Sequence, residues 1–168
     1  MADYPLDFNN LKHIKMEKSN YKKLGLMMLV SFVIMYLVMF LNVDALEHIM
    51  LSNTRTYMTL LMVAPMAISM LLFMLSMYKN KKMNAIILSI ASIVLIASFM
   101  MLRKQTLVSD VQYMKAMIPH HSSAIMTSQN AHLKDPEVKK LAKDIIKAQE
   151  EEIAQMKAAI KRLESKKQ

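Results

Sequence analysis

The sequence predicts an all-α protein in which three transmembrane helices are followed by a helical hairpin. Three long apolar runs carry no charge, two amphipathic stretches follow them, and a single glycine occurs in 168 residues. Folds rich in β-structure place glycine in their turns, so one glycine argues against them. It also excludes phosphate-binding loops, which need at least two glycines.

Cysteine is absent, whereas methionine occurs 20 times. Disulfides, thiolate nucleophiles and zinc–thiolate sites are therefore excluded. Methionine is left as the only soft sulfur ligand. The net charge of +9 does not predict nucleic acid as a partner, because the charges flank apolar runs and no aromatic stacking platform accompanies them.

The three apolar runs are residues 24–43, 56–78 and 83–102. Each is long enough to cross a hydrocarbon core of roughly 30 Å as a helix. The first is too long for a signal peptide and no small-residue cleavage site follows it, so we expect it to remain as an anchor. We divide the chain into an N-terminal segment (1–23), a transmembrane domain (24–104) and a hairpin (105–168).

Basic residues near the ends of the runs predict the orientation. Five lysines precede the first run and three separate the second from the third, whereas the opposite side carries only Arg55, Arg103 and Lys104. Positive charge is retained in the cytoplasm. We therefore expect a cytoplasmic N-terminus and a hairpin on the opposite side of the membrane, with the lipid bilayer as a partner.

The tail carries start signals for two helices. Ser109, with Gln112 three residues later, predicts a capping box for a helix that runs to Leu133. Asp135 and Pro136 predict the start of a second helix, which ends near Ser165. Two helices of this size cannot close a core alone. The hairpin must pack on a second copy, on the membrane or on a partner protein, and we expect a homodimer that forms a four-helix bundle.

Potential metal ligands gather on the first tail helix. Met114, Met117 and His121 follow one another at offsets of three and four, which places them on one face, with His120 adjacent. Each could be an ordinary core residue if taken singly. The prediction of a metal site depends on the whole set.

The second tail helix has an apolar seam that passes through Gln149 and Glu152. A carboxylate in a packing seam is costly without a partner. Folding the hairpin about Lys134 places His121 opposite residues 147–149 and Met114 near Met156. The polar part of one seam is then expected to meet the Met and His cluster of the other.

Thioether and imidazole ligands without thiolate suit copper, above all Cu(I). Cu(II) and zinc remain alternatives, and zinc would prefer the histidines with Glu152. A di-iron centre needs four carboxylates with Glu-x-x-His repeats, which the sequence lacks.

The tail also contains a specific short motif, Met117-Ile118-Pro119-His120-His121. With the later Asp135-Pro136-Glu137 and Glu152-Ile153, it resembles the bacterial family known as domain of unknown function 305. The three apolar runs resemble the membrane-anchored branch of that family. The resemblance implies a ferritin-like bundle and an association with copper handling, in a bacterial inner (cytoplasmic) membrane with a periplasmic or otherwise extracytoplasmic hairpin. The soluble relatives build four helices and this tail offers two, so we expect dimerisation to complete the bundle. The resemblance also implies functional roles for Met117, His120, His121, Met126, Gln149, Glu152 and Met156.

We therefore expect a membrane-anchored copper-binding protein that serves metal homeostasis or resistance and sequesters the ion or hands it on to a copper-transport protein. No nucleophile–base pair is visible, so we do not expect an enzyme. The candidate ligands are Met114, Met117, His120, His121, Met126, Gln149, Glu152 and Met156, with Asp44, His48 and His132 as an accessory set. The alternative is a membrane-anchored interaction module or accessory subunit without a metal role. Copper redox chemistry is a third reading.

The second apolar run contains a row of methionines at intervals of four, from Met58 to Met74. The row could conduct Cu(I) as a thioether track, but methionine also packs irregular helix contacts well. We favour packing.

Overall fold

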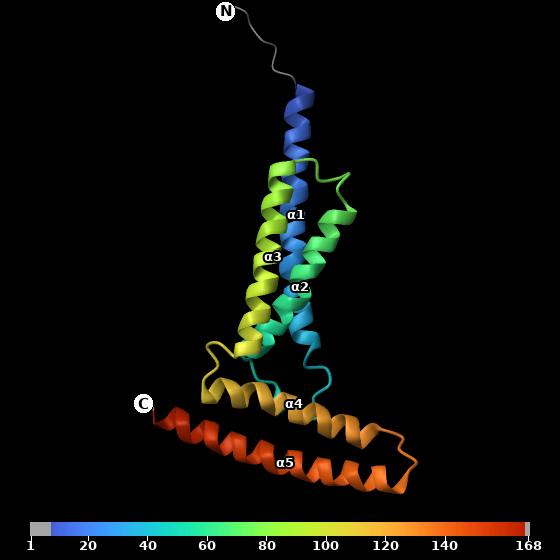
Figure 1. Cartoon of the computed structure of the whole chain (residues 1–168), viewed down its shortest axis with the longest axis vertical. Coiled ribbons are helices and arrows are strands. Elements are labelled where there is room, and N and C mark those ends of the chain that lie inside the picture. The colour runs from blue at the N-terminus through green and yellow to red at the C-terminus, as the bar shows by residue number, and fades with distance from the viewer. Residues whose placement is uncertain (1–7, 167–168) are drawn as a thin grey trace, which may run out of the picture. The chain divides into compact units, whose positions relative to one another are not determined.

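The computed structural model describes residues 8–166, and side chains for residues 19–166. It contains the helices α1 (Phe8–Val38), α2 (Asn53–Phe73), α3 (Lys81–Lys104), α4 (Asp110–Asn130) and α5 (Pro136–Ser165), and the short 3₁₀ helix η1 (Leu46–His48) (Figure 1). No strand occurs among the described residues, so the predicted all-α class is confirmed. The side chains of three of the five N-terminal lysines, Lys12, Lys15 and Lys18, lie outside the described residues.

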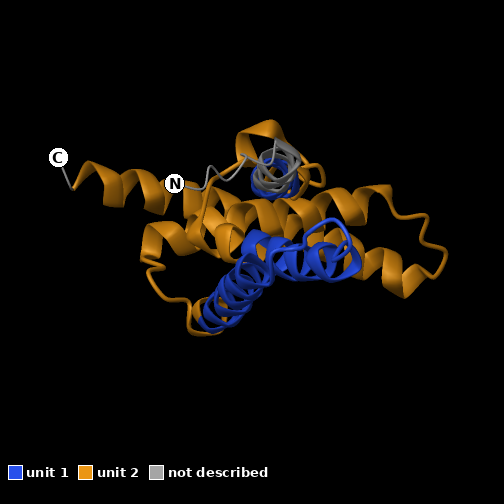
Figure 2. Ribbon diagram, turned by 90° about the horizontal axis from the view of Figure 1, so that it is seen from above, with its two compact units in different colours: residues 1–35, 59–100 blue, residues 36–58, 101–168 orange. Residues whose placement is uncertain are grey.

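The chain divides into two compact units, coloured separately in Figure 2. Unit 1 comprises residues 1–35 and 59–100, and unit 2 comprises residues 36–58 and 101–168. Unit 2 therefore contains the whole tail together with the loop between α1 and α2. The division predicted from the sequence, with a boundary near residue 104, had instead assigned this loop to the transmembrane domain.

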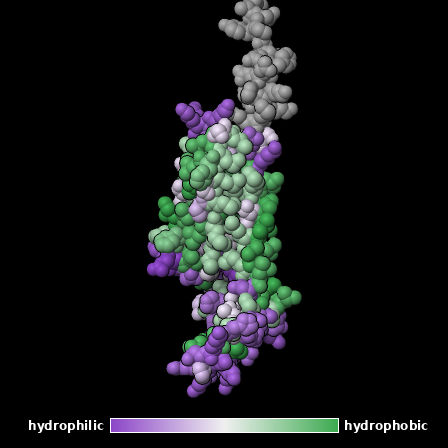
Figure 3. Space-filling model, turned by 90° about the vertical axis from the view of Figure 1, so that its right-hand side faces the viewer, coloured by the Kyte–Doolittle hydropathy of each residue, from purple (hydrophilic) through white to green (hydrophobic). Residues whose placement is uncertain are grey.

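Three helical segments, Ser19–Val38, Asn53–Phe73 and Lys81–Lys104, are long and apolar enough to cross a membrane. Their large apolar side chains point outward, and Figure 3 shows the resulting hydrophobic surface. The first two helices are displaced from the predicted runs, because α1 ends at Val38 and α2 begins at Asn53. Residues 39–42, at the end of the first run, form turns instead, so apolar composition alone placed the end of the first helix too late.

Unit 1 is held together by a small apolar cluster and a polar one. Leu24, Leu71 and Tyr78 are buried, with Met70 and Met74 packed against them. Asn84 accepts a hydrogen bond from the Tyr21 hydroxyl at 2.6 Å and donates one to the Tyr78 carbonyl at 2.7 Å. Two methionines of the row in the second run thus take part in packing.

The caps of the tail helices follow the sequence signals, with one difference. Asp135 accepts hydrogen bonds from the backbone N–H groups of Glu137 and Val138, at 2.9 and 3.0 Å, and α5 begins at Pro136 as predicted. Ser109 accepts from the Gln112 backbone N–H. The Gln112 side chain does not complete a capping box, because its oxygen accepts from the backbone N–H of Asn53 at 2.9 Å. The first tail helix ends at Asn130 rather than Leu133.

The hairpin has its own hydrophobic core between α4 and α5. Met114, Ile118 and Ile125 of α4 are buried against Ile153 and Ile160 of α5. On α5 the core residues Ile153 and Ile160 are seven apart, with half-buried Met156 between them and half-buried Gln149 and Leu163 on either side. The predicted seam was therefore wrong at Glu152. Ile153 occupies the core, and the side chain of the preceding Glu152 is 52% exposed.

Candidate metal-binding site

His121 lies at the centre of the polar contacts between the two tail helices. The residue is buried on α4, and its Nδ1 is 2.9 Å from the carbonyl oxygen of Met117, one turn earlier. Its Nε2 is 2.6 Å from the Glu152 carboxylate on α5. His121 therefore connects the motif residue Met117 to the only acidic residue among the predicted ligands of the tail.

The geometry determines where the hydrogens lie on His121. A carbonyl oxygen can only accept a hydrogen bond, so Nδ1 carries a hydrogen and donates it. In the neutral ring the lone pair of Nε2 then points at a carboxylate oxygen, which is also an acceptor. A cation must bridge these two acceptors. A metal ion could take this position once the two side chains move apart, since metal–nitrogen and metal–oxygen bonds are each about 2.0 Å, and histidine ligands are commonly oriented by an Nδ1–H bond to a backbone carbonyl.

The contact with Glu152 corrects the predicted register of the hairpin. His121 was expected opposite residues 147–149, but its partner lies three residues beyond Gln149. The hairpin is not symmetrical about Lys134, because the start of α5 extends past the end of α4 (Figure 1). Residues 136–141 are accordingly exposed.

The other predicted ligands on the hairpin are distributed along it. Met114 and Met156 line one cavity of about 330 Å³ between α4 and α5, so the predicted proximity of these two is confirmed. Met114 precedes His121 by seven residues, or about 10 Å along the helix. Met126 and Gln149 are half-buried and His132 is exposed beyond the end of α4.

Acidic and imidazole ligands alone do not complete a metal site. Nowhere in the described part of the chain do three His, Asp or Glu side chains gather closely enough to hold a metal ion. A site built around His121 and Glu152 would therefore have to include methionine or solvent ligands.

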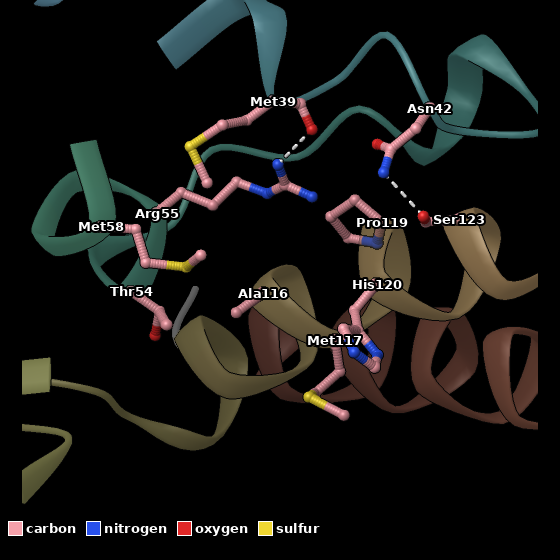
Figure 4. Close-up of a pocket in the computed structure, with 10 residues that line it drawn as sticks. All are labelled: Met39, Asn42, Thr54, Arg55, Met58, Ala116, Met117, Pro119, His120 and Ser123. Atoms are coloured by element: carbon pink, nitrogen blue, oxygen red, sulfur yellow. Dashed lines mark hydrogen bonds between the residues drawn. The ribbon is translucent and has the colours of Figure 1, made fainter. Parts of the chain in front are cut away.

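Two motif residues, Met117 and His120, line a different cavity of about 330 Å³ (Figure 4). Met39, just after α1, and Met58 of α2 line the same cavity, which we call the methionine pocket. The buried Arg55 also lines it, donates to the Met39 carbonyl at 2.6 Å, and lies 4.3 Å from the centre of the Phe40 ring.

The adjacent rings of His120 and His121 link the methionine pocket to the contact between His121 and Glu152. Their centroids are 5.9 Å apart and the rings are nearly perpendicular. His120 lines the methionine pocket and His121 contacts Glu152. The adjacent histidines of the motif thus belong to two neighbouring environments rather than to one.

The loop between α1 and α2 docks on α4 beside the motif. Ser122, which is fully buried, contacts His48 Nδ1 at 2.8 Å and accepts from the backbone N–H of Asp44 at 2.8 Å. The Asn42 amide donates to the Ser123 hydroxyl at 2.7 Å. The predicted accessory residues Asp44 and His48 therefore lie next to the motif, but the structure uses His48 Nδ1 and the Asp44 backbone to fasten the loop.

The electrostatics of this loop favour a neutral His48. Burial lowers the pKa of His48 below its usual value, and the positive charge of Lys157 on α5 lowers it further, against the opposing effects of Glu47 and Asp44. Lys157 also binds Glu47 at 2.5 Å, and this hydrogen bond lowers the pKa of the Glu47 carboxyl. With a neutral ring, Ser122 can donate its hydroxyl hydrogen to Nδ1 while accepting from Asp44.

Comparison with known proteins gives a family match over the segment that contains the motif. Residues 97–166 match the family model described as "Domain of unknown function (DUF305)". The chain is also 36% identical over 144 residues to "Uncharacterized protein L153" of Acanthamoeba polyphaga mimivirus, covering 84% of this chain and 93% of the viral protein.

This chain belongs to the domain of unknown function 305 family. The DUF305 match covers the end of α3 and the hairpin, and the longer alignment with the viral protein extends the similarity into the apolar helices. No solved structure matches the chain.

Sequence reasoning missed the contributions of the loop and the helix ends to the surroundings of the DUF305 motif. Met39, Met58 and Ser122 were not among the predicted site residues. One signal was present, because Met39 and Met58 lie near the end of the first apolar run and the start of the second. Those ends share the side of the membrane predicted for the tail, but the sequence does not reveal which side chains face it.

Proposed function

We propose that this DUF305 protein is a membrane-anchored copper-binding protein, with Cu(I) as the favoured ion, and that it sequesters copper or hands it on in metal homeostasis or resistance. The observation that carries the proposal is the orientation of His121. Its Nδ1 contacts a backbone carbonyl and its Nε2 is directed at a carboxylate. A backbone carbonyl that holds Nδ1–H leaves Nε2 as the ligating nitrogen, which is the arrangement common among metal-binding histidines.

Two further features support copper over other ions. Five methionines line cavities that touch the motif helix α4, namely Met39, Met58, Met114, Met117 and Met156. Thioethers are soft ligands that favour Cu(I), whereas magnesium and calcium require oxygen ligands. The chain has no cysteine, so methionine is its only sulfur donor.

We propose that the protein lies in a bacterial inner membrane with the N-terminus in the cytoplasm and the hairpin outside. The three apolar helices and the basic residues at their ends support this orientation. A reporter fused after Gln168 should be active only if it functions outside the cytoplasm. Activity of a cytoplasm-only reporter at that position would reverse the orientation.

We propose a homodimer in which two hairpins form a ferritin-like four-helix bundle. Its support is the exposed apolar surface of Val138 and Leu141 on α5, which the core of the hairpin does not cover. Cross-linking in nanodiscs should give a dimer. A strict monomer at all concentrations would contradict it, and binding of a different protein to this surface would favour the alternative function of an interaction module.

The direct test of the proposed function is metal analysis of the purified full-length protein, with Cu(I) competition against a calibrated chelator. We expect copper to bind and the His121→Gln and Glu152→Gln variants to bind it more weakly. Lys115→Gln is a matched control, because Lys115 also joins α4 to α5, through Glu164, without offering a ligand. If the wild-type protein bound no copper, the proposal would fail and the interaction module would replace it.

A further inference from the structure

The methionine pocket lies apart from the hairpin core yet contains two motif residues. Met117 and His120 are three apart on α4, so they share a face, and that face lines the pocket. The remaining motif histidine, His121, contacts α5 instead. A role for His121 and Glu152 therefore leaves the presence of Met117 and His120 in this pocket unexplained.

The pocket gathers soft ligands from three separate segments. Met39 follows α1, Met58 belongs to α2, and Met117 comes from α4 with His120. Figure 4 shows Met39 and Met58 on one side of the cavity, with Met117 and His120 together on the other. Methionines that serve only to contact lipid have no reason to converge with an imidazole from a distant segment.

The charges around the pocket select against divalent ions. None of the described residues that line it is acidic, and the guanidinium of Arg55 contributes a positive charge. That charge repels a divalent ion twice as strongly as a monovalent ion at the same distance. Thioethers are also the ligands preferred by Cu(I) rather than by zinc or magnesium.

We propose that the methionine pocket is a second metal site, specific for Cu(I), with three thioether ligands and the imidazole of His120. This inference deepens the proposed copper function and rests on it. The pocket supplies sulfur and nitrogen, whereas His121 and Glu152 supply nitrogen and oxygen. The 5.9 Å between the two imidazole rings makes the two sites neighbours.

The test uses the full-length protein in detergent micelles, with Cu(I) and the redox-inert Ag(I) as probes in chelator competition. The double variant Met39→Leu/Met58→Leu conserves side-chain volume and removes two sulfurs. We expect it to lower Cu(I) and Ag(I) affinity by at least about tenfold, the lower end of the loss typical for supporting groups at metal sites. Zinc should not compete for this site.

The matched control is Met27→Leu/Met62→Leu, which removes two exposed methionines that do not line the pocket. It should bind both probes as the wild type does. Unchanged affinity in the Met39→Leu/Met58→Leu variant would overturn the pocket as a metal site. X-ray absorption of the Cu(I)-loaded wild type provides a second readout that needs no variant, and a spectrum without sulfur neighbours would also overturn it.

The outcomes separate the two proposals. If Cu(I) binds to the wild type and only the His121→Gln and Glu152→Gln variants weaken it, the copper function stands and the methionine pocket is wrong. If the wild type binds neither probe, both are wrong. If the Met39→Leu/Met58→Leu variant loses Ag(I) while His121→Gln retains it, both proposals are supported and the two sites are distinct.

Discussion

The three apolar helices and the α4–α5 hairpin bury their apolar residues in opposite ways. In the three candidate spans only 6%, 28% and 11% of the residues are buried inside the protein. In the hairpin, by contrast, Ile118, Ile125 and Ile153 are almost completely buried against one another. The spans therefore need an apolar environment around them, whereas the hairpin provides its own.

The same contrast applies to methionine. Met62 and Met77 in the second apolar run are exposed, and Met70 and Met74 pack in the small core of unit 1. In unit 2, methionines line cavities next to imidazole groups. The abundance of methionine thus has two explanations. In unit 1 methionine packs the small core or lies on the surface, whereas in unit 2 three methionines share a cavity with an imidazole.

The largest expected effect is on stability, and it appears when one isoleucine of the hairpin is compared with one of the apolar helices. Ile118→Ala should destabilise the hairpin by about 2–5 kcal/mol, because it leaves a cavity in a fully buried position. Ile93→Ala, at an exposed position of α3, should change stability by less than about 0.5 kcal/mol in lipid. Hydrogen exchange in denaturant measures both changes in stability, in α4 and α5 for the first variant and in α3 for the second. Equal losses would mean that α3 is packed as tightly as the hairpin.

The next effect concerns the polar contacts that fasten the loop to α4. Ser122→Ala should cost about 1–3 kcal/mol, because it removes the buried partner of the Asp44 N–H and of His48 Nδ1. Ser123→Ala is the matched control, because its partner Asn42 is exposed and can bond to water instead. Hydrogen exchange of residues 42–50 should increase in the first variant and not in the second. The same exchange in both would show that the loop is held by apolar contacts.

A smaller effect is expected on acidification. The pKa of His48 is lower in the folded protein than in the unfolded chain, so the unfolded state binds a proton first as pH falls below about 6.5. The stability contributed by neutral His48 is present above pH 6.5 and is lost as the pH falls through the lowered pKa. Protonation of Nδ1 would also deprive the Ser122 hydroxyl of its acceptor.

Thermal unfolding of the wild type and of His48→Asn between pH 7.5 and 5 measures this loss. The variant keeps a polar group near Ser122 but does not titrate in this range, so its stability should fall less. The neighbouring Glu47, Asp44 and Lys157 are present in both proteins, and their effects cancel in the comparison. Parallel pH profiles would contradict the assignment to His48.

The smallest effect concerns the connection between α3 and α4. Leu107 is exposed and has a left-handed backbone with φ of 57°. Its carbonyl accepts from the Asn53 amide, and Tyr57 fixes the preceding carbonyl of Thr106. Leu107→Gly should stabilise the protein by about 0.5–1 kcal/mol, because glycine adopts this conformation without a steric cost. Thermal unfolding measures the gain, and a loss of stability would show that the side chain contributes contacts there.

The sequence by itself determined the helical class, the three apolar helices and the start of the last helix. These features depend on local chemistry: the length of a charge-free run, the presence of a single glycine, and an Asp-Pro pair that caps a helix. The family also followed from local features, the five-residue motif and the short matches after it. The ends of the apolar helices followed less well, because residues 39–42 carry no charge but form turns.

Only the tertiary structure decided which ligand candidates meet. A shift of three residues in the hairpin placed Glu152 rather than residues 147–149 against His121, and one step around α5 put Ile153 in the core instead of Glu152. Helix periodicity fixes the relative angles of side chains but not the offset between two helices, which depends on the packing of the whole core. For the same reason Met39 and Met58, which are more than 60 residues from His120 along the chain, could be placed in the same cavity only by the fold.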